Sequence, residues 1–408
     1  MALPALRNID VSPVQHEGQN LICIFDPEGY VEEQIVLTPA AFFVAISLDG
    51  KNDVLDIQAA FARQFRGTIL PSDDLMQIVT QLDSLGFLES ETFYAKRRAI
   101  EDAFARADAR AAYGAGRSYA SDADELRAFL DGLFTREKGP GMLPPSASGG
   151  IPLRGIVAPH IDFPRGGHAY AHAYLELARH GRPKTVILFG VAHSSPPVPF
   201  VLTRKGFDTP FGVVKTNIEF VVRLAQACAW NPFEDELVHR TEHSIEFQAV
   251  MLAYLYGPDI EIVPILCGQF TDDPFLTDAA ELSEVTAFLD VCRELAAPPE
   301  SRVTVIAGAD LAHVGKRFGD PFDITDGIVG QVGGRDRQDL EHVTRLEPEA
   351  FYRSVMRDHN QRKVCGHGAI YSLLKTVQGS AQSARLLCYD YAPDPAGGIV
   401  SFASIALI

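Results

Sequence analysis

Short apolar runs alternate with segments of helical periodicity over residues 151–408. Apolar and β-branched runs predict strands at 153–158, 184–190, 260–266, 302–308, 384–389 and 397–407. Apolar residues that recur every three or four positions predict helices near 168–180, 217–229, 242–256, 275–296, 348–358 and 366–377. This alternation indicates an α/β fold in which a mostly parallel sheet has helices on both faces.

The first 92 residues follow a different pattern, which predicts a small α+β domain. It combines two strands around a turn, three helices and a returning edge strand, at 21–25, 34–37, 40–48, 54–65, 75–85 and 86–88. Thr38 and Pro39 suit the start of the first helix, as its N-cap and its first residue. Strands and three helices in this order are typical of a winged-helix domain.

Residues 93–150 are expected to connect the two domains. Charged and alanine-rich residues up to position 112 predict a helix, and Asp122 can cap a second one. Gly, Pro and Ser are frequent in 138–150, which predicts a flexible surface loop. The expected organisation is a winged-helix-like domain, a connecting segment and an α/β domain, at 1–92, 93–150 and 151–408.

The charge balance narrows the range of partners. The 408 residues include 36 Lys and Arg against 53 Asp and Glu, a net charge of −17, which disfavours nucleic acid and anionic membrane surfaces. The first 92 residues hold four basic against 14 acidic residues, so DNA binding by the winged-helix-like domain is not expected. No apolar run approaches the roughly 20 residues that span a bilayer. Without an apolar leader, and with six scattered cysteines, we expect a cytoplasmic protein.

Residues that can bind a metal follow three of the predicted strands. His160 and His193 follow the first two, and Asp310 and His313 lie on an expected turn after the fourth. Because ligands gather at the carboxyl ends of parallel strands, these side chains should share one site. Two imidazoles with one anionic ligand and open positions suit Fe(II). Cys365 is the best third ligand, because nearby basic residues and a following helix favour its thiolate; the alternative is a buried, inert cysteine.

Further polar residues could serve the same site. Asp310 and His313 are three positions apart, so the carboxylate could orient the imidazole, and a positioned histidine is the usual general acid or base at neutral pH. Glu242, His243 and Glu246 lie at the start of a predicted helix, where we expect His243 and Glu246 to surround the site. The alternative is that Thr241 or Glu242 caps the helix and Glu246 is a solvated charge.

A series of motifs recurs in a known order along the second part of the chain. They are Val-Ala-Pro-His at 157–160, Gly-Val-Ala-His at 190–193, Thr-Pro-Phe-Gly at 209–212, Glu-His-Ser-Ile-Glu at 242–246, Val-Pro-Ile at 263–265, Asp-Leu-Ala-His-Val-Gly at 310–315 and Cys-Gly at 365–366. Through them, residues from about 107 to 408 resemble the Memo family, the B component of the AmmeMemoRadiSam set. The family's fold is similar to that of class III extradiol dioxygenases, which use non-haem iron.

The Memo resemblance implies a metal held by His160, His193 and Cys365, with Asp310 and His313 lining the same cleft. Fe(II) is the expected metal, and Cu or Zn are the alternatives. His313 would match the histidine that handles protons in the dioxygenases. Two departures bear on the substrate: residues 111–119 lack the family's His and Trp, and Asp162 and Arg165 would add charge to the pocket.

The first 92 residues resemble the PqqD-like family of winged-helix units, which hold precursor peptides. The resemblance rests on Leu-Asp-Gly at 48–50, the 54–65 helix, Asp-Asp at 73–74 and the segment 82–88. It implies a domain that binds a peptide or a partner protein. The alternative is a docking or regulatory cap on the larger domain.

These features favour a non-haem iron-dependent oxidoreductase that acts on a peptide or a small aromatic substrate. A different class is a non-enzymatic metal- or peptide-binding scaffold that partners a modifying enzyme, for instance a radical one. A third option is metal-independent thiol chemistry at Cys365 with His313 as the base.

Overall fold

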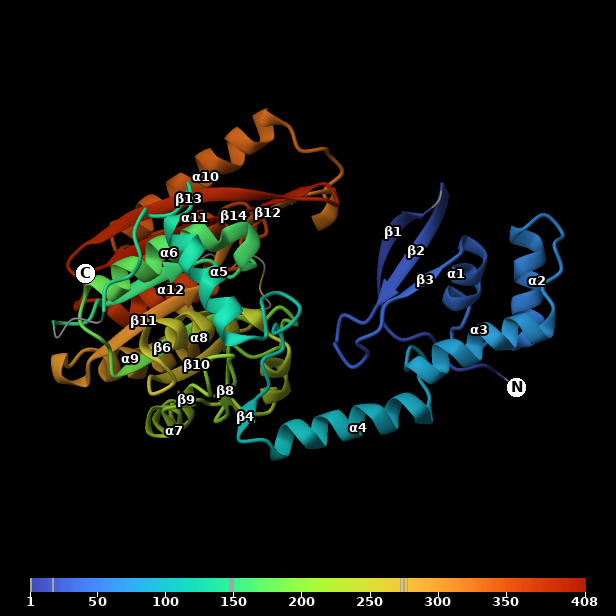
Figure 1. Ribbon diagram of the computed structural model, residues 1–408, viewed down its shortest axis with the longest axis horizontal. Helices are drawn as coiled ribbons and strands as arrows, with labels where there is room; N and C mark the ends of the chain where they lie inside the picture. The colour runs from blue at the N-terminus through green and yellow to red at the C-terminus, as the bar shows by residue number, and fades with distance from the viewer. Residues whose placement is uncertain (1, 17, 147–149, 272, 274–275, 277) are drawn as a thin grey trace. The chain divides into compact units, whose positions relative to one another are not determined.

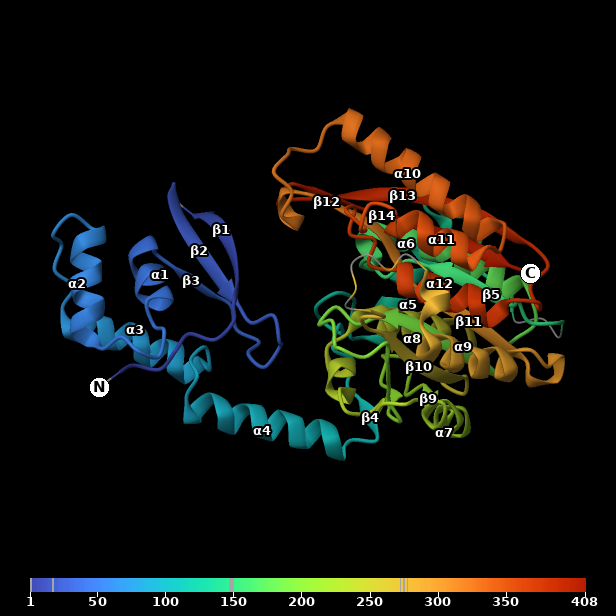
Figure 2. The ribbon, with the colours of Figure 1, turned by 180° about the vertical axis from the view of Figure 1, so that it is seen from behind.

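The computed structural model divides into two compact units, Met1–Arg106 and Ala107–Ile408. It describes residues 2–16, 18–146, 150–271, 273, 276 and 278–408 (Figures 1 and 2). Each unit has its own hydrophobic core, so each is described by itself. No helix among the described residues is long and apolar enough to cross a membrane.

The first unit consists of a three-stranded antiparallel sheet followed by helices. Its elements are β1 (Asp10–His16), β2 (Gln19–Phe25), β3 (Ile35–Leu37), α1 (Pro39–Ile46), α2 (Val54–Gln64), α3 (Ser72–Leu85) and α4 (Glu91–Arg106). Thr38 caps α1 as expected, and its side chain accepts a hydrogen bond from the Ala41 amide. The expected edge strand at 86–88 is reduced to one bridge between Leu6 and Leu88. The hairpin partner β1 was not predicted, because its residues are mostly exposed and polar.

The second unit is built on a nine-stranded mixed sheet with the order β12-β14-β5-β11-β6-β10-β7. The strands of this unit are β4 (Ala109–Arg110), β5 (Gly155–Ala158), β6 (Thr185–Val191), β7 (Phe200–Leu202), β8 (Gly206–Phe207), β9 (Lys215–Thr216), β10 (Glu261–Cys267), β11 (Val303–Gly308), β12 (Asp310–Gly315), β13 (Ala384–Asp394) and β14 (Gly398–Leu407). Strands β5, β11, β6 and β10 run parallel, as the sequence predicts, whereas β14 pairs antiparallel with β5, β12 and β13. The parallel strands therefore end at one edge of the sheet.

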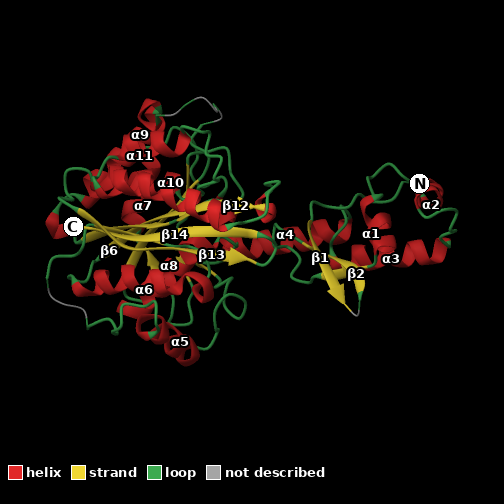
Figure 3. Cartoon of the chain, turned by 90° about the horizontal axis from the view of Figure 1, so that it is seen from above, coloured by secondary structure: helices red, strands yellow, loops and turns green. Residues whose placement is uncertain are grey.

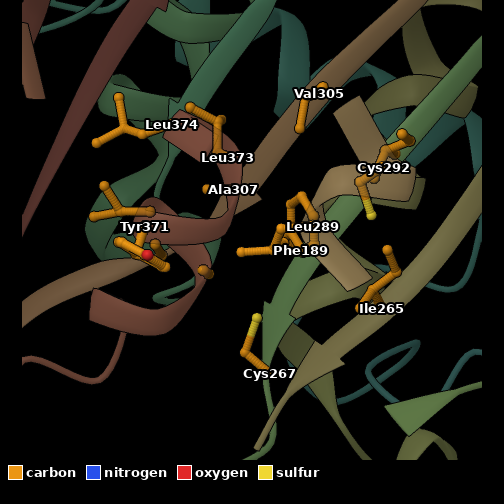
Figure 4. Close-up of a cluster of buried hydrophobic side chains, with 14 of the residues drawn as sticks. Phe189, Ile265, Cys267, Leu289, Cys292, Val305, Ala307, Tyr371, Leu373 and Leu374 are labelled. Carbon is orange, nitrogen blue, oxygen red and sulfur yellow. The ribbon is translucent and has the colours of Figure 1, made fainter. Parts of the chain in front are cut away.

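Helices cover both faces of this sheet (Figure 3). They are α5 (Ala123–Thr135), α6 (Phe163–Arg179), α7 (Ile218–Gln226), α8 (His243–Tyr256), α9 (Ser283–Ala296), α10 (Asp326–Thr344), α11 (Pro348–Met356) and α12 (His367–Val377). One core cluster joins α5, α6 and α8 to the sheet, and another joins α7, α9, α10, α11 and α12 to it. Figure 4 shows the second cluster, where Phe189 and Val305 of the sheet meet Leu289 of α9 and Leu373 of α12.

One predicted helix is shorter in the structure, one expected loop agrees with it, and α10 was not predicted. Four glycines in the first nine residues of α10 oppose a helix by about 1 kcal/mol each, and burial of its other residues outweighs that cost. The helix expected at 275–296 begins at Ser283, and positions 275 and 277 lie outside the described residues. The loop expected at 138–150 has no helix or strand in its described part, and 147–149 lie outside it.

Candidate metal centre

The ends of four elements bring the predicted site residues to one cleft of about 450 Å³. His160 follows β5, His193 follows β6, His243 begins α8, and His313 lies in β12; all four line the cleft. The start of α8 can approach the strands closely because Gly190 and Gly308 lack side chains. A Cβ on Gly308 would lie 2.5 Å from the Ser244 carbonyl oxygen, and one on Gly190 would lie 2.6 Å from the Ser244 hydroxyl.

His160 is buried and held from two sides. Its Nδ1 lies 2.9 Å from the Gly308 carbonyl, which can only accept, so Nδ1 carries a proton. Its amide donates to Asp310 Oδ1 at 2.9 Å. Its other ring nitrogen, Nε2, lies 3.3 Å from Cys365 Sγ and 3.6 Å from Asp310 Oδ2. The nitrogen that could bind a metal therefore faces the sulfur.

His193 is open to the cleft and is oriented by Glu242. Its Nδ1 lies 2.9 Å from Glu242 Oε2, and its amide donates to the same oxygen at 3.1 Å. Glu242 is also the N-cap of α8, as one alternative predicts, and accepts a hydrogen bond from the Ser244 amide. A carboxylate on one imidazole nitrogen leaves the other free for a metal, the usual arrangement around metal-binding histidines. Glu242 thus belongs to the site, a role that the sequence reasoning did not assign.

His243 is a ligand candidate that the sequence analysis placed only in the surroundings. Its ring stacks on that of His193, with centroids 4.9 Å apart, and lies 5.4 Å from the ring of His160. One ring nitrogen from each of these three histidines lies within 4.8 Å of the others, so the trio could hold a metal ion. The only signal in the sequence was that His243 directly follows the helix-capping Glu242.

Cys365 contacts the histidine cluster directly. Burial raises the pKa of its thiol, but the charges of His160 and His313 and hydrogen bonds to His160 and His193 outweigh that effect, and its pKa lies well below the usual range. These surroundings therefore favour the thiolate over the thiol. A thiolate next to imidazoles is a soft anionic donor that suits Fe(II), Cu and Zn. Its place among the ligands remains a prediction.

The three histidines titrate differently. Burial lowers the pKa of His160, but Asp310 and Cys365 raise it to about 9. Desolvation lowers the pKa of His193, and the Glu242 carboxylate raises it well above its ordinary value. Burial lowers the pKa of His243 to about 4 against the opposing effect of Glu242. At pH 7, His160 is therefore protonated, whereas His243 is neutral and so free of a competing proton.

Asp310 does not hydrogen-bond to His313, contrary to expectation. The predicted turn is strand β12, and a register shift between the two residues lets both side chains reach the cleft. Asp310 contacts His160 instead, while His313 Nδ1 lies 3.1 Å from the Leu311 carbonyl. Burial lowers the pKa of His313, but Cys365 and Asp310 raise it above its ordinary value. Asp310 thus acts on His313 through its charge.

Asp162, Arg165 and Asp394 form an ion-paired cluster in the cleft wall. Arg165 Nη2 lies 2.6 Å from Asp162 Oδ2, and Nη1 lies 3.7 Å from Asp394, so both residues predicted to add charge line the cleft as one ion-paired cluster. The alternative that Glu246 is a solvated charge is wrong. Glu246 is fully buried and lies 2.6 Å from Arg110 Nη2.

Comparison with known proteins identifies the family of this chain. The family model described as Memo-like protein matches residues 110–406. The chain belongs to the Memo family. A MEMO1 family protein of Methanopyrus kandleri is 33% identical over 297 residues, which cover 71% of this chain and 96% of the relative. One from Aquifex aeolicus is 26% identical over 98% of this chain and 99% of its own length, so that alignment includes the first unit.

The segment that departs from the Memo motif is held in place by Glu246. Glu246 Oε1 accepts hydrogen bonds from the Gly114 amide at 2.7 Å and from the Tyr119 hydroxyl. Ser118, between these two residues, lines the cleft. The segment that lacks the family's His and Trp therefore still forms part of the cleft wall, with a small polar side chain.

Proposed function

We propose that this Memo-family chain is a non-haem iron-dependent oxidoreductase that acts on a peptide or a small aromatic substrate. The observation that carries the proposal is the meeting of the His160 and His193 imidazoles with the Cys365 sulfur beside one cleft. Two imidazoles and one anionic donor with open positions suit Fe(II), and Cu or Zn are the alternatives. A fold like that of the class III extradiol dioxygenases is part of this proposal.

The donor set fits such a metal. Nδ1 of His160 and of His193 is engaged by the protein, which leaves both Nε2 atoms as ligands. We take Cys365 as the third ligand and His243 as its competitor. Bound iron would supply one-electron redox chemistry and open coordination positions.

His313 is the candidate acid–base group. It lines the cleft, and the charges of Cys365 and Asp310 raise its pKa, which favours the protonated imidazole. The Phe318 ring packs edge-on against it, with centroids 5.1 Å apart, and restricts its rotation. In the proposed reaction, His313 donates a proton to the substrate and Asp310 favours the protonated imidazole by its charge.

Oxygen uptake by the anaerobically Fe(II)-loaded chain, offered catechols and short aromatic peptides, tests this function. His313→Gln should keep the iron and lose about 100-fold or more of the turnover. His342→Gln is the matched control, because His342 is not among the residues that line the cleft. Equal turnover in both variants, or no uptake with any substrate, would contradict the proposal.

The first unit favours a second candidate, a scaffold that binds a peptide. We infer a PqqD-like winged-helix role because the unit is acidic and exposes apolar side chains such as Leu55 and Ile69, which are 72% and 83% exposed. A labelled peptide of alternating Lys and Leu, titrated into the full chain, should bind more weakly to Leu55→Glu. If the chain is a scaffold, peptide binding and complex formation should survive His313→Gln. If it performs metal-independent thiol chemistry, the alkylation rate of Cys365 should not depend on a chelator.

A further inference from the structure

A second cavity, of about 790 Å³, borders β12 away from the metal cleft. Val314 lines this cavity, and His313, which precedes it in the strand, lines the metal cleft. Neighbouring residues of a strand point to opposite faces, so the two hollows lie on opposite sides of β12. None of the residues lining the cavity lines the cleft. The cavity is therefore a site of its own.

One part of this cavity is apolar. Val314 of β12 and Val332 of α10 are buried, and Ile328 of α10 packs on the same cluster. The Phe322 ring, from the segment between these elements, is 38% exposed. A volume of this size lies within the range of small-molecule sites, which are mostly apolar with a few polar groups. The apolar part could hold one ring or a short alkyl chain.

Each acid in the polar part is already paired with a cation of the cavity. Asp358 Oδ2 accepts from Arg335 at 2.9 Å, and Oδ1 accepts from the Gln361 amide at 3.4 Å. Asp320 Oδ1 accepts from Lys363 at 2.7 Å, and Oδ2 accepts from the Gly315 amide at 2.8 Å. Each carboxylate oxygen in the cavity lining thus already has a donor.

The cations in the polar part have donors to spare. Arg335 uses one nitrogen, Nη2, for Asp358, and its Nη1 has no acceptor among the residues that the structure describes. Lys363 Nζ has three protons and donates to Asp320 and to the Gln361 carbonyl, which leaves one. These spare donors are carried by cations, so they match an anionic acceptor.

We propose that this cavity binds a small molecule with an apolar, ring-sized body and a carboxylate. The body would lie on Val314, Ile328 and Phe322, and the carboxylate would meet Arg335 and Lys363. The bound molecule would touch the turn that precedes Cys365. The backbone carbonyl of Arg362 in that turn accepts a hydrogen bond from the His313 amide at 2.7 Å, so the site adjoins the metal centre without sharing its cleft.

Calorimetric titration of the full chain with two matched probes tests the proposal. 3-Phenylpropionate and its amide, 3-phenylpropanamide, share the ring and differ in charge. We expect the carboxylate to bind roughly tenfold more tightly, because it gains a charge-assisted hydrogen bond. In Arg335→Gln this preference should disappear, while the affinity for the amide stays the same.

Asp358→Asn separates ligand recognition from folding. Both variants break the same partly exposed ion pair, so a structural effect would shift binding in the same direction. Recognition by Arg335 predicts opposite shifts, since Asp358→Asn frees the guanidinium and should raise the affinity for 3-phenylpropionate a few-fold. Arg317→Gln, which removes an arginine of the metal cleft, should change neither affinity. Equal binding of the two probes, shifts in one direction for Arg335→Gln and Asp358→Asn, or loss of the preference in Arg317→Gln would overturn the proposal.

Discussion

His160 and His193 both follow a parallel strand, yet the protein surrounds them differently. On the β5 side, His160 is buried against a backbone carbonyl, Asp310 and Cys365. On the β6 side, the His193 side chain is 40% exposed and rests on the Glu242 carboxylate. The buried side fixes geometry through many contacts, whereas the open side depends on one charged partner. Loss of the metal-binding histidine should therefore have different consequences on the two sides.

Removal of each histidine should give the largest effects and separate the two sides. His160→Ala and His193→Ala should each lower the affinity for Fe(II) by more than about 100-fold, since each removes a proposed ligand. His160→Ala should also destabilise the chain more than His193→Ala, by roughly 1–3 kcal/mol, because the His160 ring is buried whereas the His193 side chain is 40% exposed. Anaerobic metal titration and urea unfolding measure the two effects. Equal stability of the two variants would remove the distinction between the sides.

Glu242→Gln should weaken metal binding through His193 on the open side alone. The amide keeps a hydrogen-bond acceptor but loses the charge that orients His193 and raises its basicity, so Fe(II) affinity should fall roughly 10- to 100-fold. Glu236→Gln is the control, because Glu236 is an acid outside the cleft lining. Gln248→Glu would not serve as a control, because it would bury a new charge. Unchanged affinity in Glu242→Gln would mean that His193 does not bind the metal.

The pH dependence of the metal affinity should be the smallest of these effects. The pKa of His160 is raised to about 9, so this imidazole is protonated at pH 7 in the metal-free protein, and the pKa of His193 is raised too, which favours its protonated form. Metal must displace these protons, and its apparent affinity should rise about tenfold or more per pH unit between 6 and 8. His243, with a pKa of about 4, releases no proton in this window. A flat profile would contradict the two raised values.

Part of this site could be predicted from sequence, and the remainder depended on packing between distant elements. Apolar runs located β5 and β6, and strand ends placed His160 and His193 together. The role of His243 could not be predicted, because it depends on how closely α8 approaches Gly190 and Gly308. Glu246 looked like a surface charge because its partner, Arg110, is 136 positions away in a two-residue strand.

In the fold, local patterns predicted the parallel strands, and long-range contacts decided the rest. The Asp310–Gly315 segment starts with a polar residue and is short, so a turn was expected, but pairing with β14 makes it a strand. In α10, glycines masked a helix that the core stabilises. In each case the missing information lay in a partner far away in the chain.

X-ray absorption of the anaerobically Fe(II)-loaded chain tests the central claim most directly. If one ion is held by the imidazoles at the strand ends and by Cys365, the spectrum should show one sulfur together with nitrogen or oxygen neighbours. The sulfur signal should vanish in Cys365→Ser and persist in His243→Ala. A spectrum with no sulfur, unchanged by Cys365→Ser and altered by His243→Ala, would contradict the proposed ligand set and assign the third position to His243.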